Sequence, residues 1–320
     1  MKFKKALFIN IAEAALDKEY WQEIDVLFER KVMLPKDSPD IIKELKDTDC
    51  LLSGFAIPIT KEQIDAAPNL KYIGTLAIAF HKIDIKYARK KGIPVTNIAG
   101  YCTDSVAEFV FAALLNELRQ LDEGKRRVMA QNYEIGGLTA REIRGKTLGV
   151  LGLGNIGKRV AELAQGFGAN VVYWSRHRKP ECEAKGIKYV ERDDLLKTAD
   201  FISLNFAHTA DTDKIINAAA LKFIKPGAVV VNTAPVELVD INALAARLAH
   251  NDLTFVLDHS DEMSADDLKK LSAFKNCIIY PPIAFLSQEA RINKQNLFIS
   301  NIESFLAGQP VNVVNELGCY

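Results

Sequence analysis

The first hundred residues alternate short apolar runs with stretches in which apolar residues recur at helical spacing. One such stretch, 84–91, ends at Gly92, as many helices do. The apolar runs predict strands at 6–9, 50–52, 72–73 and 93–96. Strands that alternate with helices in this way favour a parallel sheet with helices on its faces.

A long amphipathic helix leads into a second region of the same kind. It begins near Asp104, where Ser105 and Glu108 have the spacing of a capping box, and Val106 and Val110 lie on its apolar face. The strands predicted beyond it are 147–151, 170–174, 201–206, 228–232, 253–257 and 277–280, and a last helix covers about 287–306. We therefore predict an α/β protein with two doubly wound parallel-sheet domains, the central one a Rossmann domain.

The segment 152–157 has the G-x-G-x-x-G pattern of dinucleotide-binding proteins. It follows a predicted strand and opens a predicted helix at 158–165, which is the context that gives this pattern its meaning. Gly152 makes the tight turn, Gly154 lets a pyrophosphate approach the backbone, and Gly157 lets the helix pack on the strand. Asn155 and Ile156 complete this candidate cofactor-binding segment. The alternative is a glycine turn that binds no ligand, which the alternation of strands and helices around it disfavours.

The end of the next strand indicates which cofactor binds. An acidic residue about 20 positions beyond the glycines would bind the ribose 2′-hydroxyl of NAD. Residues 173–179 contain no acid, whereas Ser175, Arg176 and Arg178 offer charge-assisted hydrogen bonds to a 2′-phosphate. We therefore expect NADP(H) in preference to NAD(H). The alternative is a solvated basic loop that binds no cofactor.

Composition narrows the class of protein. The 320 residues are 48% apolar and 26% charged, which is typical of a globular chain, and 41 basic residues balance 41 acidic ones. This balance gives no reason to expect a nucleic acid or membrane partner. No apolar stretch reaches the roughly 18 residues of a spanning helix, and no signal peptide is evident, so a cytoplasmic protein is expected. Five scattered cysteines suggest neither a disulfide framework nor a metal site.

Six segments along the chain carry a resemblance to a known family. They are 95–108, 145–157, 231–240, 257–258, 287–291 and 312–315. Together they resemble the D-2-hydroxyacid dehydrogenases, with glycerate dehydrogenase or hydroxypyruvate reductase as the closest type. The resemblance implies an outer domain formed by 1–99 and 288–320 and a dinucleotide-binding domain formed by 100–287. It also implies a small-molecule ligand in the interdomain cleft, a homodimer, and a cofactor near Thr212, Thr233 and Asp258.

The chain departs from the family at the residues that should perform the chemistry. The family uses an Arg to bind the substrate carboxylate and keto oxygen, a His to exchange the hydroxyl proton, and a Glu to tune that His. Matching segments place Pro235 at the Arg position, Pro282 at the His position and Met263 at the Glu position. Glu262 is one residue away, so a small loop shift could present it instead of Met263. Proline has no charge and no proton to exchange, and ordinary turnover is therefore expected to be weak or absent.

Three functions remain open. The first is an enzyme repurposed for another substrate or reaction, in which His81 and Lys82 bind an anion. Its candidate proton carriers are His208, His259, Glu262 and Tyr280. The second is a non-catalytic NADP(H)-binding sensor or interaction protein. The third is a working hydroxypyruvate or glyoxylate reductase with replacement catalytic residues. Any one of these His and Tyr side chains can instead serve a local hydrogen bond.

Overall fold

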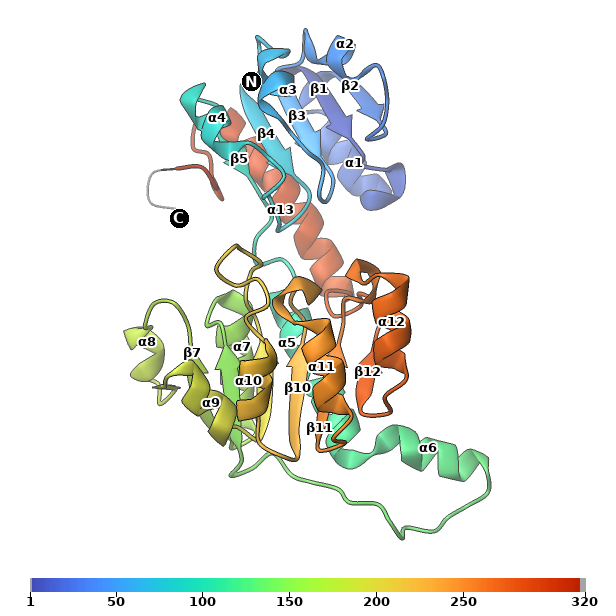
Figure 1. Ribbon diagram of the computed structural model, residues 1–320. Helices are drawn as coiled ribbons and strands as arrows, with labels where there is room; N and C mark the ends of the chain where they lie inside the picture. The colour runs from blue at the N-terminus through green and yellow to red at the C-terminus, as the bar shows by residue number, and fades with distance from the viewer. Residues whose placement is uncertain (1, 317–320) are drawn as a thin grey trace. The chain divides into compact units, whose positions relative to one another are not determined.

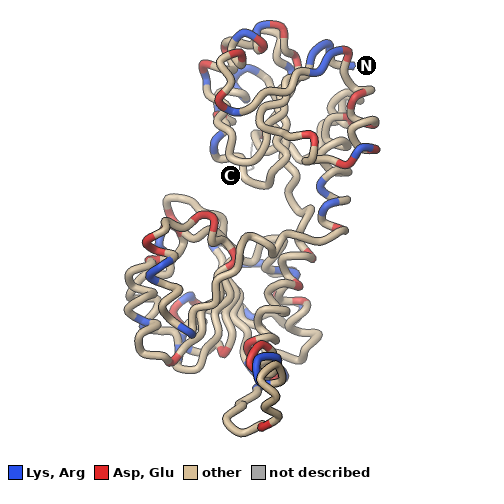
Figure 2. Tube along the Cα trace, turned by 90° about the vertical axis from the view of Figure 1, so that its right-hand side faces the viewer, with Lys and Arg blue, Asp and Glu red and all other residues tan. Residues whose placement is uncertain are grey.

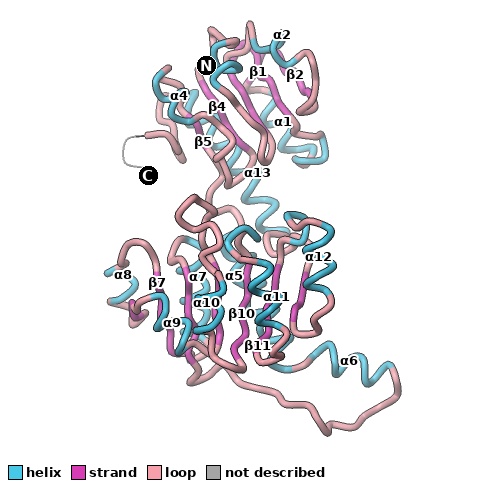
Figure 3. Tube along the Cα trace, viewed as in Figure 1, coloured by secondary structure: helices cyan, strands magenta, loops and turns pink. Residues whose placement is uncertain are grey.

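The computed structural model describes residues 2–316 of the chain. The chain divides into two compact units, coloured along the sequence in Figure 1. Unit 1 consists of Met1–Cys102 and Gln288–Tyr320, and unit 2 consists of Thr103–Ser287. Both are layered α/β structures with a parallel sheet, which confirms the predicted class and the two doubly wound sheets (Figure 3).

The sheet of unit 1 has five parallel strands in the order β2-β1-β3-β4-β5. Its elements are β1 (Phe3–Ile9), η1 (Glu13–Ala15), α1 (Lys18–Asp25), β2 (Phe28–Leu34), α2 (Ile41–Leu45), β3 (Cys50–Ser53), α3 (Lys61–Asp65), β4 (Tyr72–Thr75), α4 (Ile85–Lys90), β5 (Val95–Thr96) and α13 (Gln288–Leu306). Helices α1 and α13 pack on one face of this sheet and α2, α3 and α4 on the other. This strand order is one of the two common doubly wound orders.

The edge strand β2 is the strand of this unit that the sequence pattern does not predict. Phe28 is buried, but the two residues after it are exposed and the next four are only partly buried. An edge strand has a neighbour on one side alone, so its side chains need not alternate between core and solvent. Its backbone pairing with β1 decides its conformation.

The sheet of unit 2 has seven parallel strands in the order β12-β11-β10-β9-β6-β7-β8. Its strands are β6 (Thr147–Leu151), β7 (Asn170–Trp174), β8 (Lys188–Tyr189), β9 (Phe201–Leu204), β10 (Ala228–Asn232), β11 (Leu253–Leu257) and β12 (Cys277–Ile279). Its helices are α5 (Thr103–Arg119), α6 (Leu121–Met129), α7 (Asn155–Gly166), α8 (Pro180–Glu183), α9 (Arg192–Thr198), α10 (Ala218–Phe223), α11 (Ile241–Leu248) and α12 (Ala265–Ser272), with short 3-10 turns η2 (Val236–Leu238) and η3 (Ser260–Glu262). The strand order is that of a Rossmann domain. From β6 the chain adds strands outward on one side as far as β8, and from β9 it adds them outward on the other side, so β6 and β9 lie at the switch point of this parallel sheet.

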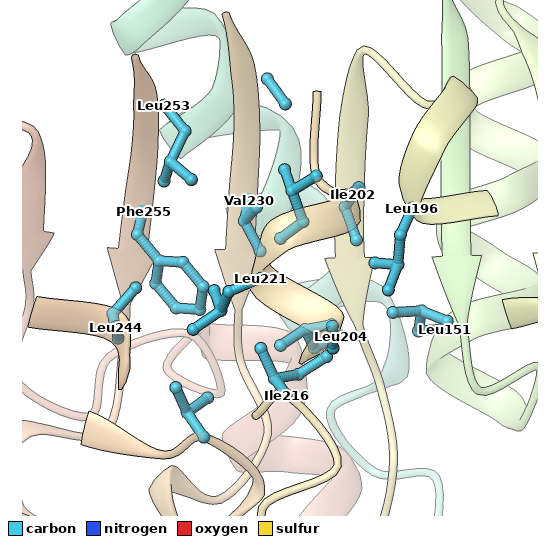
Figure 4. Close-up of a cluster of buried hydrophobic side chains, with 14 of the residues drawn as sticks. Leu151, Leu196, Ile202, Leu204, Ile216, Leu221, Val230, Leu244, Leu253 and Phe255 are labelled. Atoms are coloured by element: carbon cyan, nitrogen blue, oxygen red, sulfur yellow. The ribbon is translucent and has the colours of Figure 1, made fainter. Parts of the chain in front are cut away.

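Alternating strand side chains fill the two faces of this sheet. One set packs against α9, α10, α11 and α12, and Figure 4 shows this cluster. The members from the strands include Leu151, Ile202, Leu204, Val230 and Phe255. The residues between them in sequence face α5 and α7 on the other side. Because both faces are buried, the central strands are mostly apolar, which is why the sequence predicts them well. The short edge strand β8, with exposed Lys188, has no such run and is not predicted.

Element ends differ slightly from the predictions. The strands expected at 201–206 and 277–280 end at Leu204 and Ile279. The helix expected at 158–165 begins at Asn155, because the glycine turn leads directly into it. Among residues 2–316, no helix has the length and apolarity that a membrane crossing requires.

The cysteines that the structure describes are buried free thiols: Cys50, Cys102, Cys182 and Cys277. Cys319 lies outside the described residues. No cluster of three or more His, Cys, Asp or Glu side chains suited to a metal ion occurs in the part of the chain that the structure describes.

Candidate functional site

Two glycines shape the turn between β6 and α7. Gly152 has a φ of +93°, and a Cβ there would lie 2.8 Å from the carbonyl oxygen of Asn205. A Cβ at Gly157 would overlap the carbonyl oxygen of Gly152. Side chains are therefore excluded at both positions by the protein itself, so that β6, α7 and the loop after β9 can approach closely.

Gly154 is different, because no contact with residues 2–316 requires a glycine there. Its φ is −80° and its ψ −162°, which other residues adopt, and an added Cβ would meet no atom within 4 Å. No side chain caps the N-terminus of α7, so its N–H groups are available to an anion. Open space beside an uncapped helix N-terminus fits the pyrophosphate of a dinucleotide. Asn155 is exposed in the first turn of α7, and Ile156 packs on the core.

The two arginines of the basic loop after β7 have different partners. Arg176 pairs with Asp211 across 3.0 Å, and both side chains are largely exposed. Arg178 is bound to Glu183 on α8 and lies 5.1 Å from the ring centre of Tyr189. Because an exposed pair contributes little free energy, Arg176 is the easier of the two to recruit to a ligand. The Ser175 hydroxyl donates to the His177 carbonyl at 2.6 Å.

The loops that follow β10, β11 and β12 are joined through Asp258. Its Oδ1 accepts hydrogen bonds from the backbone N–H groups of Ile283 and Ala284 at 3.0 and 3.1 Å. Its own N–H donates to the Asn232 carbonyl at the end of β10. Asp258 is almost completely buried, and this burial raises the pKa of its carboxyl group. The backbone donors in this network have no signature in the sequence.

The sequence left open whether Met263 or Glu262 takes the family's Glu position, and the structure places these two side chains in different surroundings. Met263 packs against the buried cluster under the sheet. Glu262 turns the other way, and its Oε2 accepts a hydrogen bond from the backbone N–H of Val236 at 3.0 Å. Glu262 therefore joins the loop after β11 to the loop after β10, directly beside Pro235.

Pro235 and Pro282 occupy equivalent places on either side of β11. Each lies three residues beyond the end of its strand, which is Asn232 for β10 and Ile279 for β12. Both ends are in register with Leu257, the last residue of β11. Both prolines are partly exposed.

His259 lies among the carboxylates of its own loop. Its Nε2 is 3.8 Å from Asp258 Oδ2, and its Nδ1 is 3.9 Å from Asp261 Oδ1 and 3.7 Å from Glu262 Oε1. The ring is 25% exposed. These separations are too long for hydrogen bonds, so none of the three carboxylates fixes the orientation of the ring.

Three other predicted site residues are His208 and Thr212, in the loop after β9, and Tyr280, which follows β12. His208 Nε2 lies 3.0 Å from Asp213 Oδ1 in an exposed pair. Thr212 Oγ1 donates to the Ala207 carbonyl, inside the same loop. The Tyr280 ring packs edge-on against Phe109 of α5, and burial raises the pKa of its hydroxyl. These surroundings favour a packing role for Tyr280.

The remaining predicted residues are Thr233, His81 and Lys82. Thr233 is partly exposed immediately beyond β10. His81 and Lys82 are exposed in unit 1, in the segment that follows β4. The hollow that they line with Thr75 has no room for even a water molecule. Anion binding by His81 and Lys82 stays a prediction.

Comparison with known proteins identifies the family. The family model described as D-isomer specific 2-hydroxyacid dehydrogenase, NAD binding domain, matches residues 111–284. Glyoxylate reductase of Thermococcus litoralis is 35% identical over 96% of this chain and 93% of its own length. The chain belongs to the D-2-hydroxyacid dehydrogenase family. Hydroxypyruvate reductase of Blautia hydrogenotrophica, another relative, is 30% identical over 88% of this chain and 89% of its own.

Solved structures agree with this assignment. D-lactate dehydrogenase from Aquifex aeolicus, complexed with NAD and lactic acid, superposes with a TM-score of 0.84 at 28% identity, over 97% of this chain and 99% of its own. An acyclic imino acid reductase in complex with NADPH and D-Arg gives 0.82 at 30% identity, with the same coverage. Unit 2, which contains the family match, is therefore the nicotinamide dinucleotide-binding domain of a 2-hydroxyacid dehydrogenase-like protein.

Proposed function

We propose that this family member is an NADP(H)-dependent oxidoreductase whose catalytic site has been rebuilt for an acceptor other than an ordinary 2-oxo acid. The observation that carries the proposal is the pair Pro235 and Pro282, at strand ends whose register the sheet fixes. Neither residue can bind a carboxylate or exchange a proton. Met263, at the third family position, packs on the core. Reduction of glyoxylate, hydroxypyruvate or pyruvate is therefore expected to be slow.

The proposed cofactor site uses the glycine turn and the basic loop. Gly154 and the N-terminus of α7 would receive the pyrophosphate, and Asp258 would lie near the nicotinamide amide. Ser175, Arg176 and Arg178 would receive the 2′-phosphate of NADP(H). When bound, the cofactor supplies a hydride to the acceptor. The similar structures contain NAD in one case and NADPH in the other, so the preference rests on this chain's own residues.

Cofactor preference is tested by fluorescence titration of the protein with NADPH and NADH. NADPH is expected to bind at least about tenfold more tightly, and Arg176→Ala to remove most of this difference through loss of a charge-assisted hydrogen bond. Lys188→Ala is the matched control, since Lys188 is an exposed basic residue of β8. Tighter binding of NADH by the wild-type protein would overturn the NADP(H) preference.

The catalytic part of the proposal is tested by following NADPH absorbance at 340 nm with glyoxylate, hydroxypyruvate and pyruvate. Turnover is expected to be about 10²-fold or more below that of a family member with a proton-exchanging His, the lower limit of general acid–base catalysis. Tight NADPH binding with slow turnover supports a rebuilt site. Rapid turnover of any of the three acids would contradict it.

A working glyoxylate or hydroxypyruvate reductase is the second candidate. It is favoured by the 35% identity with glyoxylate reductase over nearly the whole of both chains. In that case other groups at the strand ends, such as His259, would exchange the proton. One similar structure is an acyclic imino acid reductase, so proteins with this fold also act on acceptors other than 2-oxo acids.

We also propose that the protein is a homodimer. Helix α6 and the segment after it extend from the sheet of unit 2 (Figure 1), and they expose large apolar side chains. Met129 is 85% exposed and Ile135 81% exposed, with Leu121, Val128 and Tyr133 nearby in sequence. Charges of both signs are interspersed on α6 (Figure 2). Apolar side chains gathered on one projecting arm are typical of a protein interface.

A further inference from the structure

Asp211 and Arg176 connect the two loops that flank the glycine turn. Arg176 lies in the loop after β7 and Asp211 in the loop after β9, and both strands are direct neighbours of β6 in the sheet. Arg176 Nη2 donates to Asp211 Oδ2 at 3.0 Å. Because parallel strands end at the same edge of a sheet, this ion pair joins the loops on both sides of the turn at 152–157.

The loop after β9 presents Asp211 to the basic loop through hydrogen bonds of its other residues. Thr212 Oγ1 donates to the Ala207 carbonyl at 2.8 Å and accepts from the Thr209 N–H at 2.7 Å. Asp211 takes no part in these contacts, and its side chain is 79% exposed. Within residues 2–316 its ion pair is with Arg176 alone. Asp211 can therefore leave Arg176 without disturbing the rest of its loop.

The bases of the two loops are held together independently of this ion pair. Trp174, the last residue of β7, packs edge-on against Phe206 of the loop after β9, with the ring centres 5.7 Å apart. Arg176 is 61% exposed, so both members of the ion pair have room to rotate into solvent. The pair can thus open by side-chain rotation while the loops stay in place.

Arg178 does not offer the same choice of partner. Its partner Glu183 also accepts a hydrogen bond from the Tyr173 hydroxyl at 2.8 Å and is only 23% exposed. The Arg178 guanidinium lies 5.1 Å from the ring centre of Tyr189. These contacts make the Arg178 pair part of the folded loop, whereas the pair of Arg176 and Asp211 is held by its own charges alone.

The Asp211 carboxylate engages the guanidinium that NADP(H) would need. An Arg near the end of this strand is the usual partner of a 2′-phosphate, and a phosphate monoester carries about −1.5 to −2 charges at pH 7. A phosphate that reaches Arg176 must displace Asp211 or lie beside a like charge, and both cost free energy. The ribose 2′-hydroxyl of NAD(H) is uncharged and does not compete for Arg176.

We propose that Asp211 is a specificity-determining residue of the cofactor site, which competes with the 2′-phosphate of NADP(H) for Arg176 and so limits the preference for NADP(H) over NAD(H). The inference rests on the proposed function, in that the adenosine end of the cofactor must lie at the loops after β6 and β7. In the free protein Arg176 donates to Asp211. When NADP(H) binds, the guanidinium turns to the phosphate and Asp211 rotates into solvent. When NAD(H) binds, the ion pair stays closed.

Fluorescence titrations with NADPH and NADH test this competition. Asp211→Asn is expected to bind NADPH about two- to fivefold more tightly than the wild-type protein, the range that an exposed ion pair contributes, with no change for NADH. In an Arg176→Ala background the same substitution should lose most of this gain, because no guanidinium is left to compete for. Asp266→Asn, which removes an exposed carboxylate of α12 in the same unit, is the control and should change neither affinity.

Salt provides a second readout. At roughly 1 M salt, where the Debye length is about 3 Å, the gain of Asp211→Asn should largely disappear, and a gain that persists would overturn the inference. Unchanged or weaker NADPH binding by Asp211→Asn would also overturn it, as would a full gain in the Arg176→Ala background. Failure of the proposed function has a different signature, since a wild-type protein without measurable affinity for NADPH would overturn both.

Discussion

The carboxylate of Glu262 accepts a hydrogen bond from the backbone N–H of Val236, with the two atoms 3.0 Å apart. This contact joins the loops after β10 and β11 beside Pro235. Val236 is buried, so its N–H has little access to water. The neighbouring Met263 packs on the core instead. Glu262 therefore has a structural role: its carboxylate holds the loops after β10 and β11 together.

Removal of this acceptor should loosen the strand-end loops. Glu262→Ala leaves the Val236 N–H without its partner, which should cost about 1–3 kcal/mol of unfolding free energy. Glu262→Gln keeps a carbonyl oxygen as acceptor and should unfold near the wild-type midpoint. Urea denaturation followed by tryptophan fluorescence measures both. Equal midpoints for the alanine and wild-type proteins would show that the contact does not stabilise the fold.

The glycines of the turn after β6 should separate folding from cofactor binding. Gly157→Ala brings a Cβ into the Gly152 carbonyl oxygen, so this variant should be strongly destabilised or insoluble. Gly154→Ala meets no protein atom within 4 Å and should melt normally. It should nevertheless weaken NADPH binding by about tenfold or more, because the methyl group occupies the space of the pyrophosphate. Normal NADPH affinity in a folded Gly154→Ala protein would place the pyrophosphate elsewhere.

The exposed arm of unit 2 should mediate self-association. Replacement of Met129 and Ile135 together by Glu places charges among the apolar side chains of the arm. Light scattering is expected to show about twice the 35.5 kDa chain mass for the wild-type protein and a single chain mass for the variant. Ile42→Glu alters an exposed apolar residue of unit 1 and serves as the control. A wild-type protein that is monomeric at all concentrations would contradict the proposed dimer.

The network around Asp17 should make unit 1 sensitive to acid. Asp17 accepts hydrogen bonds from Arg291 and Gln295 of α13, and these lower the pKa of its carboxyl group to about 2. A carboxyl whose pKa is depressed by folding stabilises the protein above its unfolded pKa of about 3.9. This contribution disappears as the pH falls from about 4 toward about 2.

Asp17→Asn should therefore melt below the wild-type protein at pH 7, and the difference should shrink as the pH is lowered below about 4. Asp37→Asn, which changes another exposed carboxylate of unit 1, should show no such trend. Calorimetric melts at several pH values compare the three proteins. A difference in melting temperature that stays constant down to pH values near 3 would exclude Asp17 as the titrating group.

The sequence by itself determined the fold and the location of the dinucleotide turn. Strands such as 228–232 and 253–257 are buried on both faces and therefore appear as continuous apolar runs. The turn at 152–157 is equally visible, because only glycine satisfies the close contacts at positions 152 and 157. The prolines at 235 and 282 could be located because segments that resemble the family lie directly beside them.

The tertiary structure decided how the strand-end loops are organised. Only the fold shows that Met263 faces the core while Glu262 reaches the Val236 N–H, since a one-residue choice in a loop leaves no periodic signal. It also revealed the edge strand β2, which pairing with β1 holds despite its weak pattern. The charge around His259 likewise arises from packing. Hydrogen bonds to backbone groups and the sum of nearby charges depend on distances in space, which the order of residues alone does not specify.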